Sequence, residues 1–343
     1  MGGPALPAAR SLDHLAPNVI LARREAFRLA QIAVRGAAAT GVRPPSSHIS
    51  PSHSGFIMSA LADRDFVKMN GLGNEIVIVD LRRAPALISA AEARAAARQE
   101  PYDQLMALYP ARGGSVAAIR IFNNDGSEAG ACGNGMRCVA ALVSAETGGS
   151  DLTFETPAGI VSCKRRDDGL FTVDMGRPRF RWDEIPLARE FSDTRAIELK
   201  VPGMPSLQSP SAVNMGNPHA IFWVEDPAAY DLAKIGPPLE HDPLFPERAN
   251  ITLAATPTRS RVVIRTWERG AGLTKACGSA ACAAAVGAAR LDRTGRKVTV
   301  SLAGGDLAIE WRESDDHVLM TGPVEYEHNS RFDAALFAAA DVL

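Results

Sequence analysis

Two cysteines of this chain, Cys132 and Cys277, lie in the same short context, between an alanine and a glycine. Helix-favouring segments follow both, so each cysteine is expected at the start of a helix. Unpaired backbone N–H groups and a partial positive charge at a helix N-terminus lower the pKa of a thiol and also bind carboxylates. The same feature would supply both a thiolate base and an anchor for a substrate carboxylate.

The two cysteine contexts belong to a longer repeat. An arginine precedes each cysteine by twelve positions, and the asparagines of Gly73-Asn74 and Gly216-Asn217 precede them by 58 and 60 positions. A lone cysteine is more commonly a core residue, and we assign that role to Cys138, Cys163 and Cys282. Duplication favours a catalytic role for the other two. Thiols from two halves of a repeat can face one planar carbon and move a proton across it.

Polar side chains that suit a zwitterion accompany the cysteines. Amide side chains donate and accept hydrogen bonds, although a single asparagine is more often a turn residue; the candidates are Asn74, Asn123, Asn217 and Asn250. Glu268-Arg269 precedes Cys277 in a glycine-containing loop and would bind an ammonium and a carboxylate, or else form a surface ion pair of little energy. His219 either shapes the pocket or caps a strand.

Composition restricts the class of protein. The chain has 343 residues, enough for two domains, and a net charge of −2, which gives no electrostatic reason to bind nucleic acid or an anionic membrane. No apolar run approaches the ~20 residues needed to span a bilayer. Five cysteines without a C-x-x-C pair favour a reducing compartment over a disulfide framework, and the scattered histidines give little support for a structural zinc site.

The predicted elements mix strands with few helices. The expected strands are residues 66–69, 76–81, 116–122, 152–155, 159–164, 170–175, 212–225, 250–255, 261–267, 298–303 and 306–311. The expected helices are 89–99, with Ser89 as N-cap and Glu92 in a capping box, then 133–144, closed by Gly148-Gly149, and 278–291. This order indicates an α+β fold with one small-residue helix in each half, not a regular βαβ alternation.

The first 60 residues differ from the rest, with six arginines and only two acidic residues, Asp13 and Glu25. Three interpretations stay open. The segment is an organellar transit peptide, a disordered tail with an amphipathic helix near residues 19–34, or an extension ahead of a true start at Met58. We expect a cytoplasmic protein, or an organellar one if the transit peptide is genuine.

Longer stretches of the sequence resemble the diaminopimelate epimerase family. The matching stretches are residues 68–74, 102–104, 120–126, 131–138, 215–219, 246–251, 267–272 and 276–279, within a resemblance that covers about residues 64 to 330. Asn70 stands where many members have histidine and Glu75 where many have aspartate. Ala280 replaces the usual second glycine of Cys-Gly-Ser-Gly.

The resemblance implies two pseudo-symmetric domains, each a mixed or antiparallel sheet wrapped around a central helix, with the active site in the interdomain cleft. The boundaries we expect are 1–60 for the extension, 64–175 for the N-terminal domain with a C-terminal return at 319–335, and 176–318 for the C-terminal domain. A homodimer that needs no cofactor and no metal is also implied.

The implied reaction is epimerisation of L,L-diaminopimelate to meso-diaminopimelate by two thiols, without pyridoxal phosphate, in lysine and peptidoglycan precursor synthesis. Cys132 and Cys277 are the implied catalytic residues. The implied substrate-binding positions are Asn74, Gln104, Asn123, Gly133, Asn134, Asn217, Asn250, Glu268, Arg269, Gly278 and Ser279. The alternatives are a racemase of the same fold for proline, hydroxyproline or histidine, a thiol-redox protein, and a non-catalytic binding module.

Overall fold

The structure is a computed structural model that describes residues 59–201, 203–204 and 207–338. Everything below concerns the unit that spans residues 56–343, within those described ranges. The expectations for a transit peptide, for a helix at 19–34 and for a start at Met58 fall outside the described residues.

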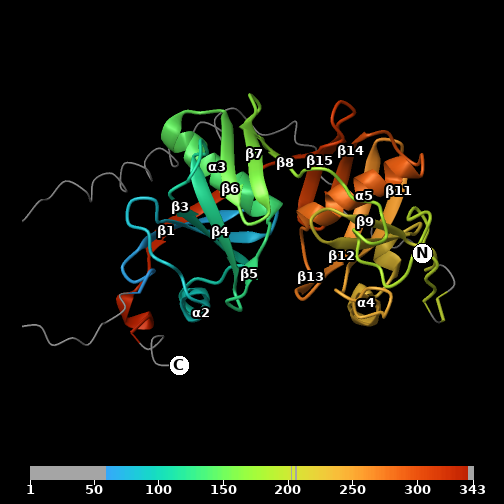
Figure 1. Ribbon diagram of the computed structural model, residues 1–343, viewed down its shortest axis with the longest axis horizontal. Helices are drawn as coiled ribbons and strands as arrows, with labels where there is room; N and C mark the ends of the chain where they lie inside the picture. Colours follow the sequence, from blue (N-terminus) through green and yellow to red (C-terminus); the bar gives the residue numbers. More distant parts are fainter. Residues whose placement is uncertain (1–58, 202, 205–206, 339–343) are drawn as a thin grey trace, which may run out of the picture. The chain divides into compact units, whose positions relative to one another are not determined.

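The first half of this unit contains eight strands and two α-helices (Figure 1). They are β1 (Asp65–Asn70), β2 (Glu75–Asp80), α2 (Ala90–Gln99), β3 (Gln104–Tyr109), β4 (Ala117–Asn123), β5 (Glu128–Ala129), α3 (Gly133–Thr147), β6 (Asp151–Thr156), β7 (Gly159–Arg165) and β8 (Phe171–Asp174). The predicted stop of α3 is confirmed, because Gly148 caps the helix with a left-handed φ of 78°.

The second half repeats this order. It contains β9 (Ser211–Asn214), β10 (Pro218–Trp223), η2 (Pro227–Ala229), α4 (Leu232–Glu240), β11 (Asn250–Thr258), β12 (Arg261–Glu268), β13 (Gly272–Leu273), α5 (Gly278–Arg290), β14 (Lys297–Leu302), β15 (Gly305–Trp311) and β16 (Val318–Gly322). The chain continues through β17 (Glu325–Arg331) and η3 (Ala334–Leu336).

Strand pairing shows that the halves are copies of one topology. In the first half β2 pairs with β3 and β4 with β6 in parallel, whereas β1–β2, β3–β4, β6–β7 and β7–β8 are antiparallel. The second half has the same sequence of parallel and antiparallel pairs from β9 to β16. The predicted α+β fold with two pseudo-symmetric halves is therefore confirmed.

A central helix organises each half. Helix α5 packs against strands from β9 to β16 and has ten buried residues, and α3 packs against β2, β3, β7 and β8. The colours of Figure 1 show α3 beside the blue and green strands, and α5 among the yellow to red ones. Small side chains, mostly alanine, let the strands approach α5 closely, so its N-terminus is held rigidly.

Two strands near the C-terminus join the halves. β16 pairs with β15 of the second half and also, antiparallel, with β8 of the first half. β17 then returns to pair with β1. We propose the division into domains at residues 64–175 and 176–318 with a C-terminal return at 319–335, which these pairings support.

Several elements differ from the sequence expectations. Residues 212–225 form two strands, β9 and β10, because the Asn214 side chain accepts a hydrogen bond from the Gly216 N–H at 2.7 Å and closes a turn. Helix α4 was not predicted, since it contains Pro237 and Pro238, which normally break helices. Burial of its apolar face against β11 and β12 offsets that cost. Strands β3, β5, β13, β16 and β17 were also not predicted.

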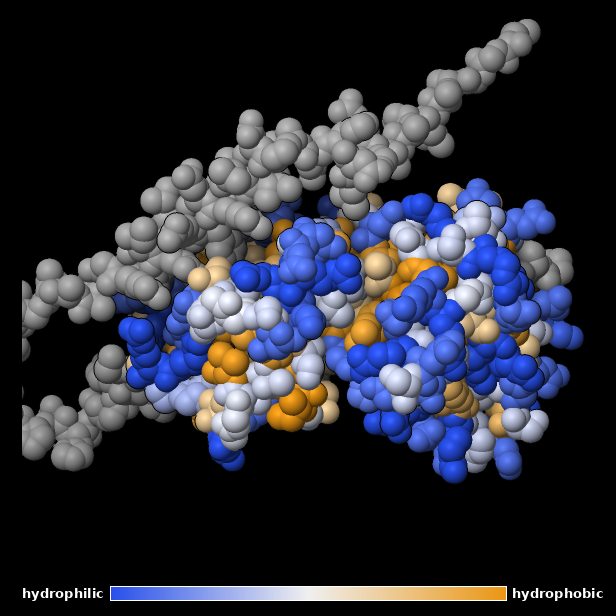
Figure 2. Space-filling view, turned by 90° about the horizontal axis from the view of Figure 1, so that it is seen from above, coloured by the Kyte–Doolittle hydropathy of each residue, from blue (hydrophilic) through white to orange (hydrophobic). Residues whose placement is uncertain are grey.

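The surface and the core separate as expected. The face shown in Figure 2 is mostly hydrophilic, with smaller hydrophobic patches. Among the described residues the exposed large apolar side chains are Leu87, Ile160 and Leu273. The core of the first half includes Ala60 and Leu61, so the residues just after Met58 pack on the fold.

The capping box at α2 is confirmed and extends further than predicted. Ser89 accepts from the Glu92 N–H, and Glu92 Oε2 accepts from the Ser89 N–H at 2.8 Å. Glu92 Oε1 also accepts from the Ser59 hydroxyl and the Ala60 N–H, both at 2.6 Å. The buried Glu92 carboxylate therefore links Ser59 and Ala60 to the start of α2 by hydrogen bonds.

We expect Glu92→Ala to destabilise the protein by roughly 1–3 kcal/mol, because it leaves several buried donors without an acceptor. Chemical denaturation monitored by circular dichroism measures this loss. Glu313→Ala is the control, since Glu313 is exposed. Equal stability of the two variants would contradict the role assigned to Glu92.

Candidate active site

Cys132 is the N-cap residue of α3. Its Sγ accepts a hydrogen bond from the Gly135 N–H at 3.3 Å, which the extended backbone of the cap residue permits. The thiol lies 3.6 Å from Gln104 Oε1 and 3.8 Å from Asn74 Oδ1. Two predicted binding residues from other strands thus meet the first predicted catalytic cysteine.

A chain of side-chain hydrogen bonds holds these amides. Gln104 begins β3 and lies opposite Asn123, the last residue of β4, and its Nε2 donates to Asn123 Oδ1 at 3.5 Å. Asp103 Oδ2 accepts from Asn74 Nδ2 and from the Glu75 N–H, both at 2.8 Å. Asp103 was not predicted as a site residue. Its carboxylate directly before Gln104, in a stretch that carries the family resemblance, was the signal that could have identified it.

Cys277 is the N-cap residue of α5 and is only 4% exposed. Its Sγ lies 3.5 Å from Ser279 Oγ. The Glu268 carboxylate accepts a hydrogen bond from the Thr274 hydroxyl and interacts with the Cys277 thiol. Burial raises the pKa of Glu268 above its ordinary range, and the Thr274 and Cys277 bonds oppose that change. The second cysteine therefore has a carboxylate beside it.

Four more predicted residues, Asn217, His219, Asn250 and Arg269, form a second cluster at the starts of β10 and β11 and the end of β12. His219 lies opposite Asn250 in the parallel pair, and Asn217 Oδ1 is 2.8 Å from His219 Nε2. Asn250 donates to the Pro218 carbonyl at 3.0 Å and accepts from the Arg269 N–H at 2.9 Å. The Asn250 amide thus fixes the backbone at Arg269, whose Nη1 donates to the Glu247 carbonyl at 2.9 Å.

His219 is neutral in this cluster. Burial, followed by the nearby Arg269 charge, lowers the pKa of His219 to about 3. Its Nδ1 is buried and has no hydrogen-bond partner among the described residues.

The N-termini of α3 and α5 meet at the junction of the halves. Asn134 Nδ2 donates to the carbonyl of Ala276, the residue before Cys277, at 3.3 Å. A Cβ at Gly133 would lie 2.6 Å from the Met320 side chain, and one at Gly278 would lie 2.8 Å from it. A side chain at either position would displace the flexible end of Met320 of β16, which packs against both helix starts.

The two cysteines also share electrostatic surroundings. Glu268 raises the pKa of both thiols, although burial is the larger cause at each. Burial raises the pKa of Cys132 to about 11 and that of Cys277 well above its ordinary value. The N–H groups of Gly135 and Ala280 at the helix starts lower the two pKa values as predicted, but burial outweighs them, so the predicted thiolate near neutral pH is wrong.

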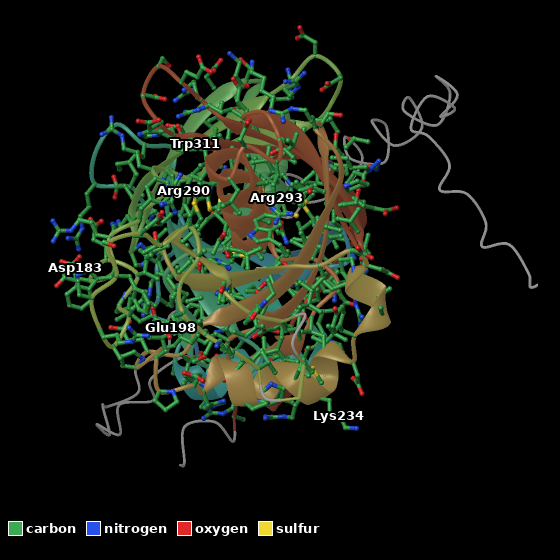
Figure 3. The ribbon with its side chains drawn as sticks, turned by 90° about the vertical axis from the view of Figure 1, so that its right-hand side faces the viewer. Asp183, Glu198, Lys234, Arg290, Arg293 and Trp311 are labelled. Carbon is green, nitrogen blue, oxygen red and sulfur yellow. The ribbon has the colours of Figure 1, made fainter. Side chains whose placement is uncertain are left out.

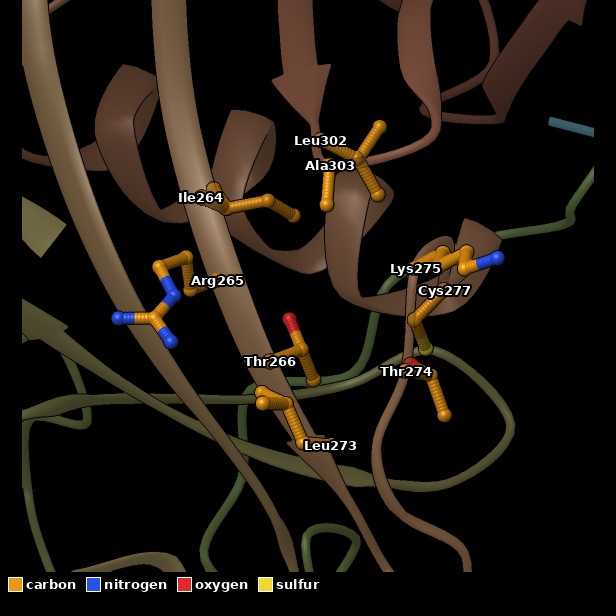
Figure 4. A pocket seen from close by; sticks show the side chains of 9 residues that line it. All are labelled: Ile264, Arg265, Thr266, Leu273, Thr274, Lys275, Cys277, Leu302 and Ala303. Atoms are coloured by element: carbon orange, nitrogen blue, oxygen red, sulfur yellow. The ribbon is translucent and has the colours of Figure 1, made fainter. Parts of the chain in front are cut away.

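A cavity of about 210 Å³ reaches the Cys277 thiol from within the second half (Figure 4). Its lining is largely apolar and includes Ile264, Leu273 and Leu302, with the exposed Lys275 at one side. Cys132 and the amides around it do not line this cavity. The cavity therefore covers only the Cys277 side of the candidate site.

Within the part of the chain that the structure describes, no group of three or more His, Cys, Asp or Glu side chains is arranged to hold a metal ion. No helix in that part is long and apolar enough to cross a membrane.

Solved structures show the same fold. A predicted epimerase from Pseudomonas aeruginosa matches with a TM-score of 0.57 at 20% identity, over 78% of this chain and 99% of that chain. A phenazine biosynthesis protein of the PhzF family from Bacillus anthracis matches with a TM-score of 0.59 at 16% identity, over 79% and 99%. At such identities the likeness concerns the fold alone.

Curated sequences are much more similar. A diaminopimelate epimerase of Rhodopseudomonas palustris (strain TIE-1) is 63% identical over 287 residues, 82% of this chain and 98% of the relative. One from Afipia carboxidovorans is 62% identical over 288 residues, 82% and 99%. The family model described as diaminopimelate epimerase matches residues 66–181 and 211–327, one segment in each half. The chain belongs to the diaminopimelate epimerase family.

Proposed function

We propose that this protein converts L,L-diaminopimelate to meso-diaminopimelate by cofactor-independent proton transfer, as a step in lysine and peptidoglycan precursor synthesis. The family membership and the high identity to curated diaminopimelate epimerases support the substrate. The observation that carries the mechanism is the pair of equivalent helices, α3 and α5, that meet at their N-termini with one cysteine each.

In the proposed reaction the substrate α-carbon lies between the two thiols. One cysteine, as thiolate, removes the α-proton, so the C–H bond breaks and its electron pair delocalises into the carboxylate. The other cysteine, as thiol, delivers its proton to the opposite face and becomes the thiolate. Backbone N–H groups at Gly133-Asn134 and Gly278-Ser279 would hold the reacting carboxylate and stabilise its growing charge.

The high thiol pKa values require a way to form the thiolate. We infer that Glu268 accepts the proton of Cys277, because its buried carboxylate adjoins that thiol and its own pKa is raised. Transfer between two groups buried together moves one negative charge a short distance and leaves the net charge of the site unchanged. Closure over the substrate would keep water from competing for the proton.

The residues proposed to bind substrate divide between the two clusters of the site. They are Asn74, Gln104, Asn123, Gly133, Asn134, Asn217, Asn250, Glu268, Arg269, Gly278 and Ser279, with His219 shaping the pocket. Arg269 is proposed to grip the distal carboxylate, since one guanidinium N–H group bonds Glu247 and the guanidinium has further donors. Asn250 would act by holding the Arg269 backbone.

We propose that the protein acts as a homodimer in the cytoplasm, as the family resemblance implies. The candidate site described above is assembled from one chain. For a dimer, light scattering should give twice the chain mass. Because the site comes from one chain, dilution to monomers should leave the site intact. A monomer at all concentrations would contradict the dimer without affecting the reaction.

Replacement of either proposed catalytic thiol should abolish epimerisation. We expect Cys132→Ala and Cys277→Ala each to be folded and inactive, because each face of the α-carbon needs its own proton carrier. The assay follows deuterium entry at the α-carbon of L,L-diaminopimelate in D2O, together with formation of the meso isomer.

Cys138→Ala and Cys282→Ala are matched controls on the same two helices. Both cysteines are fully buried, so these variants should lose stability and keep the chemistry largely intact. Substantial turnover by either catalytic-site variant would refute the two-thiol mechanism. Exchange at proline but not at diaminopimelate would instead indicate a racemase of different specificity.

Arg269→Lys should lower kcat/KM by at least about tenfold, which corresponds to 1.4 kcal/mol, because lysine keeps the charge but loses the planar fork. An analogue without the distal carboxylate should be a poor substrate of the wild type and lose little more in the variant. Arg259→Lys, at an exposed ion pair with Asp292, is the control. An equal further loss with the analogue would show that Arg269 has only a structural role.

A further inference from the structure

Arg137 is a charged residue in the interior of this fold. It lies in the second turn of α3, its side chain is completely buried, and it is one of the largest fully buried side chains in the described residues. No Asp or Glu forms an ion pair with it within the described ranges, 59–201, 203–204 and 207–338. Arginine stays protonated in proteins, so a positive charge is buried there without an acidic partner.

The hydrogen bonds of Arg137 go only to neutral acceptors. Nη1 donates to Asn134 Oδ1 at 3.0 Å and lies 3.6 Å from Met320 Sδ, and Nε donates to the Pro323 carbonyl at 3.4 Å. Nη2 is buried and has no partner among the described residues. These contacts leave the positive charge uncompensated, although burial of an unpaired charge costs several kcal/mol.

The surroundings of Arg137 indicate where a compensating negative charge arises. Burial lowers the pKa of Arg137, and the thiols that oppose this change are, in order of effect, Cys138, Cys132, Cys282 and Cys163. Only Cys132 among these is at the candidate site and partly accessible. On Cys132 the charges of Glu268 and Asp103 raise the pKa, and Arg137 lowers it. The Gly135 N–H, which donates to Cys132 Sγ at 3.3 Å, lowers this pKa more than Arg137 does, and Arg137 adds the charge of a cation five residues along the same helix.

Arg137 also orients a residue that joins the two helix starts. Because Asn134 Oδ1 accepts from Arg137, the amide must present its Nδ2 group to the Ala276 carbonyl. Ala276 precedes Cys277, so one side chain links the charge near the first thiol to the backbone that carries the second. A residue with this pair of contacts influences both thiols without touching substrate.

We propose that Arg137 is a positioning and electrostatic residue of the reaction, whose buried guanidinium offsets the negative charge that forms on Cys132 and holds Asn134 across the junction of the two helices. This proposal rests on the proposed function for the catalytic role of Cys132. The buried cation lowers the free energy of the state with a thiolate at Cys132, and so raises the fraction of the enzyme in which Cys132 can accept the α-proton.

The test separates charge from hydrogen bonding. Arg137→Gln keeps a donor for Asn134 and removes the charge, and Arg137→Lys keeps the charge and removes the fork. Arg290→Gln is the matched control, because Arg290 (labelled in Figure 3) is the last residue of the equivalent helix α5. At a rise of 1.5 Å per residue it lies about 18 Å along the axis from the N-terminus. Circular dichroism and thermal melting establish that each variant is folded.

The first readout needs no substrate. Iodoacetamide alkylation of Cys132 is followed by peptide mass spectrometry between pH 7 and 10. Because the pKa of Cys132 is raised, the wild-type rate should climb about tenfold per pH unit over this range. Arg137→Gln should be slower by roughly tenfold at each pH, as a pKa higher by one unit requires. Arg137→Lys and Arg290→Gln should stay near the wild type.

The second readout is epimerisation of L,L-diaminopimelate. In Arg137→Gln we expect kcat to fall at least about tenfold with little change in KM, and Arg137→Lys to recover part of the loss. A folded Arg137→Gln variant with the wild-type alkylation profile and kcat would overturn the proposal. If that variant does not fold, Arg137→Met removes the charge together with the hydrogen bond to Asn134. A folded Arg137→Met variant with the wild-type alkylation profile and kcat would overturn the proposal in the same way.

The two proposals fail separately. A wild type that exchanges no α-proton of diaminopimelate in D2O refutes the proposed function, whereas the alkylation profiles still decide whether Arg137 favours the thiolate. An active wild type whose Cys132 reactivity is unaffected by Arg137→Gln refutes the proposal for Arg137 and leaves the proposed function intact.

Discussion

The rest of this structure depends on holding the N-termini of α3 and α5 together. Each end carries unpaired N–H groups and a partial positive charge, so the two ends repel each other unless an anion lies between them. The buried guanidinium of Arg137 adds a full positive charge to the same region. A binding site so rich in donors and positive charge suits a carboxylate. The hydrogen bond from Asn134 to the Ala276 carbonyl, the pairing of β16 with β8 and the packing of Met320 hold the two ends together.

The topology supplies that packing. Each helix is enclosed by strands of its own half, and β16 and β17 cross from the second half to pair with β8 and β1 of the first. Met320 of β16 fills the space between the two helix starts, where Gly133 and Gly278 leave room for it. The crossing strands thus determine how closely the two cysteines approach, and mutations in them would affect the chemistry without altering a proposed catalytic group.

Burial and catalysis oppose each other at the thiols. Enclosing Cys132 and Cys277 raises their pKa values and makes thiolate scarce at neutral pH. The same enclosure strengthens every electrostatic interaction in the site and excludes water. Neighbouring charges then decide how a thiolate forms: Glu268 is placed to take a proton from Cys277, and Arg137 is placed to favour negative charge on Cys132.

The sequence by itself determined the fold class, the repeat, the positions of α3 and α5 and the residues proposed for the site. These follow from local patterns, such as the capping box at Ser89, the glycine stop at Gly148 and the two Ala-Cys-Gly contexts. Tertiary structure decided what depends on distant contacts. Burial reversed the expected direction of the thiol pKa values, packing against β11 and β12 formed α4 despite its prolines, and β16 and β17 crossed between the halves. Asp103 and Arg137 do not stand out in the sequence. In the fold, Asp103 accepts hydrogen bonds from Asn74 and Glu75, whereas Arg137 is buried without an acidic partner among the described residues, and these surroundings suggest their roles.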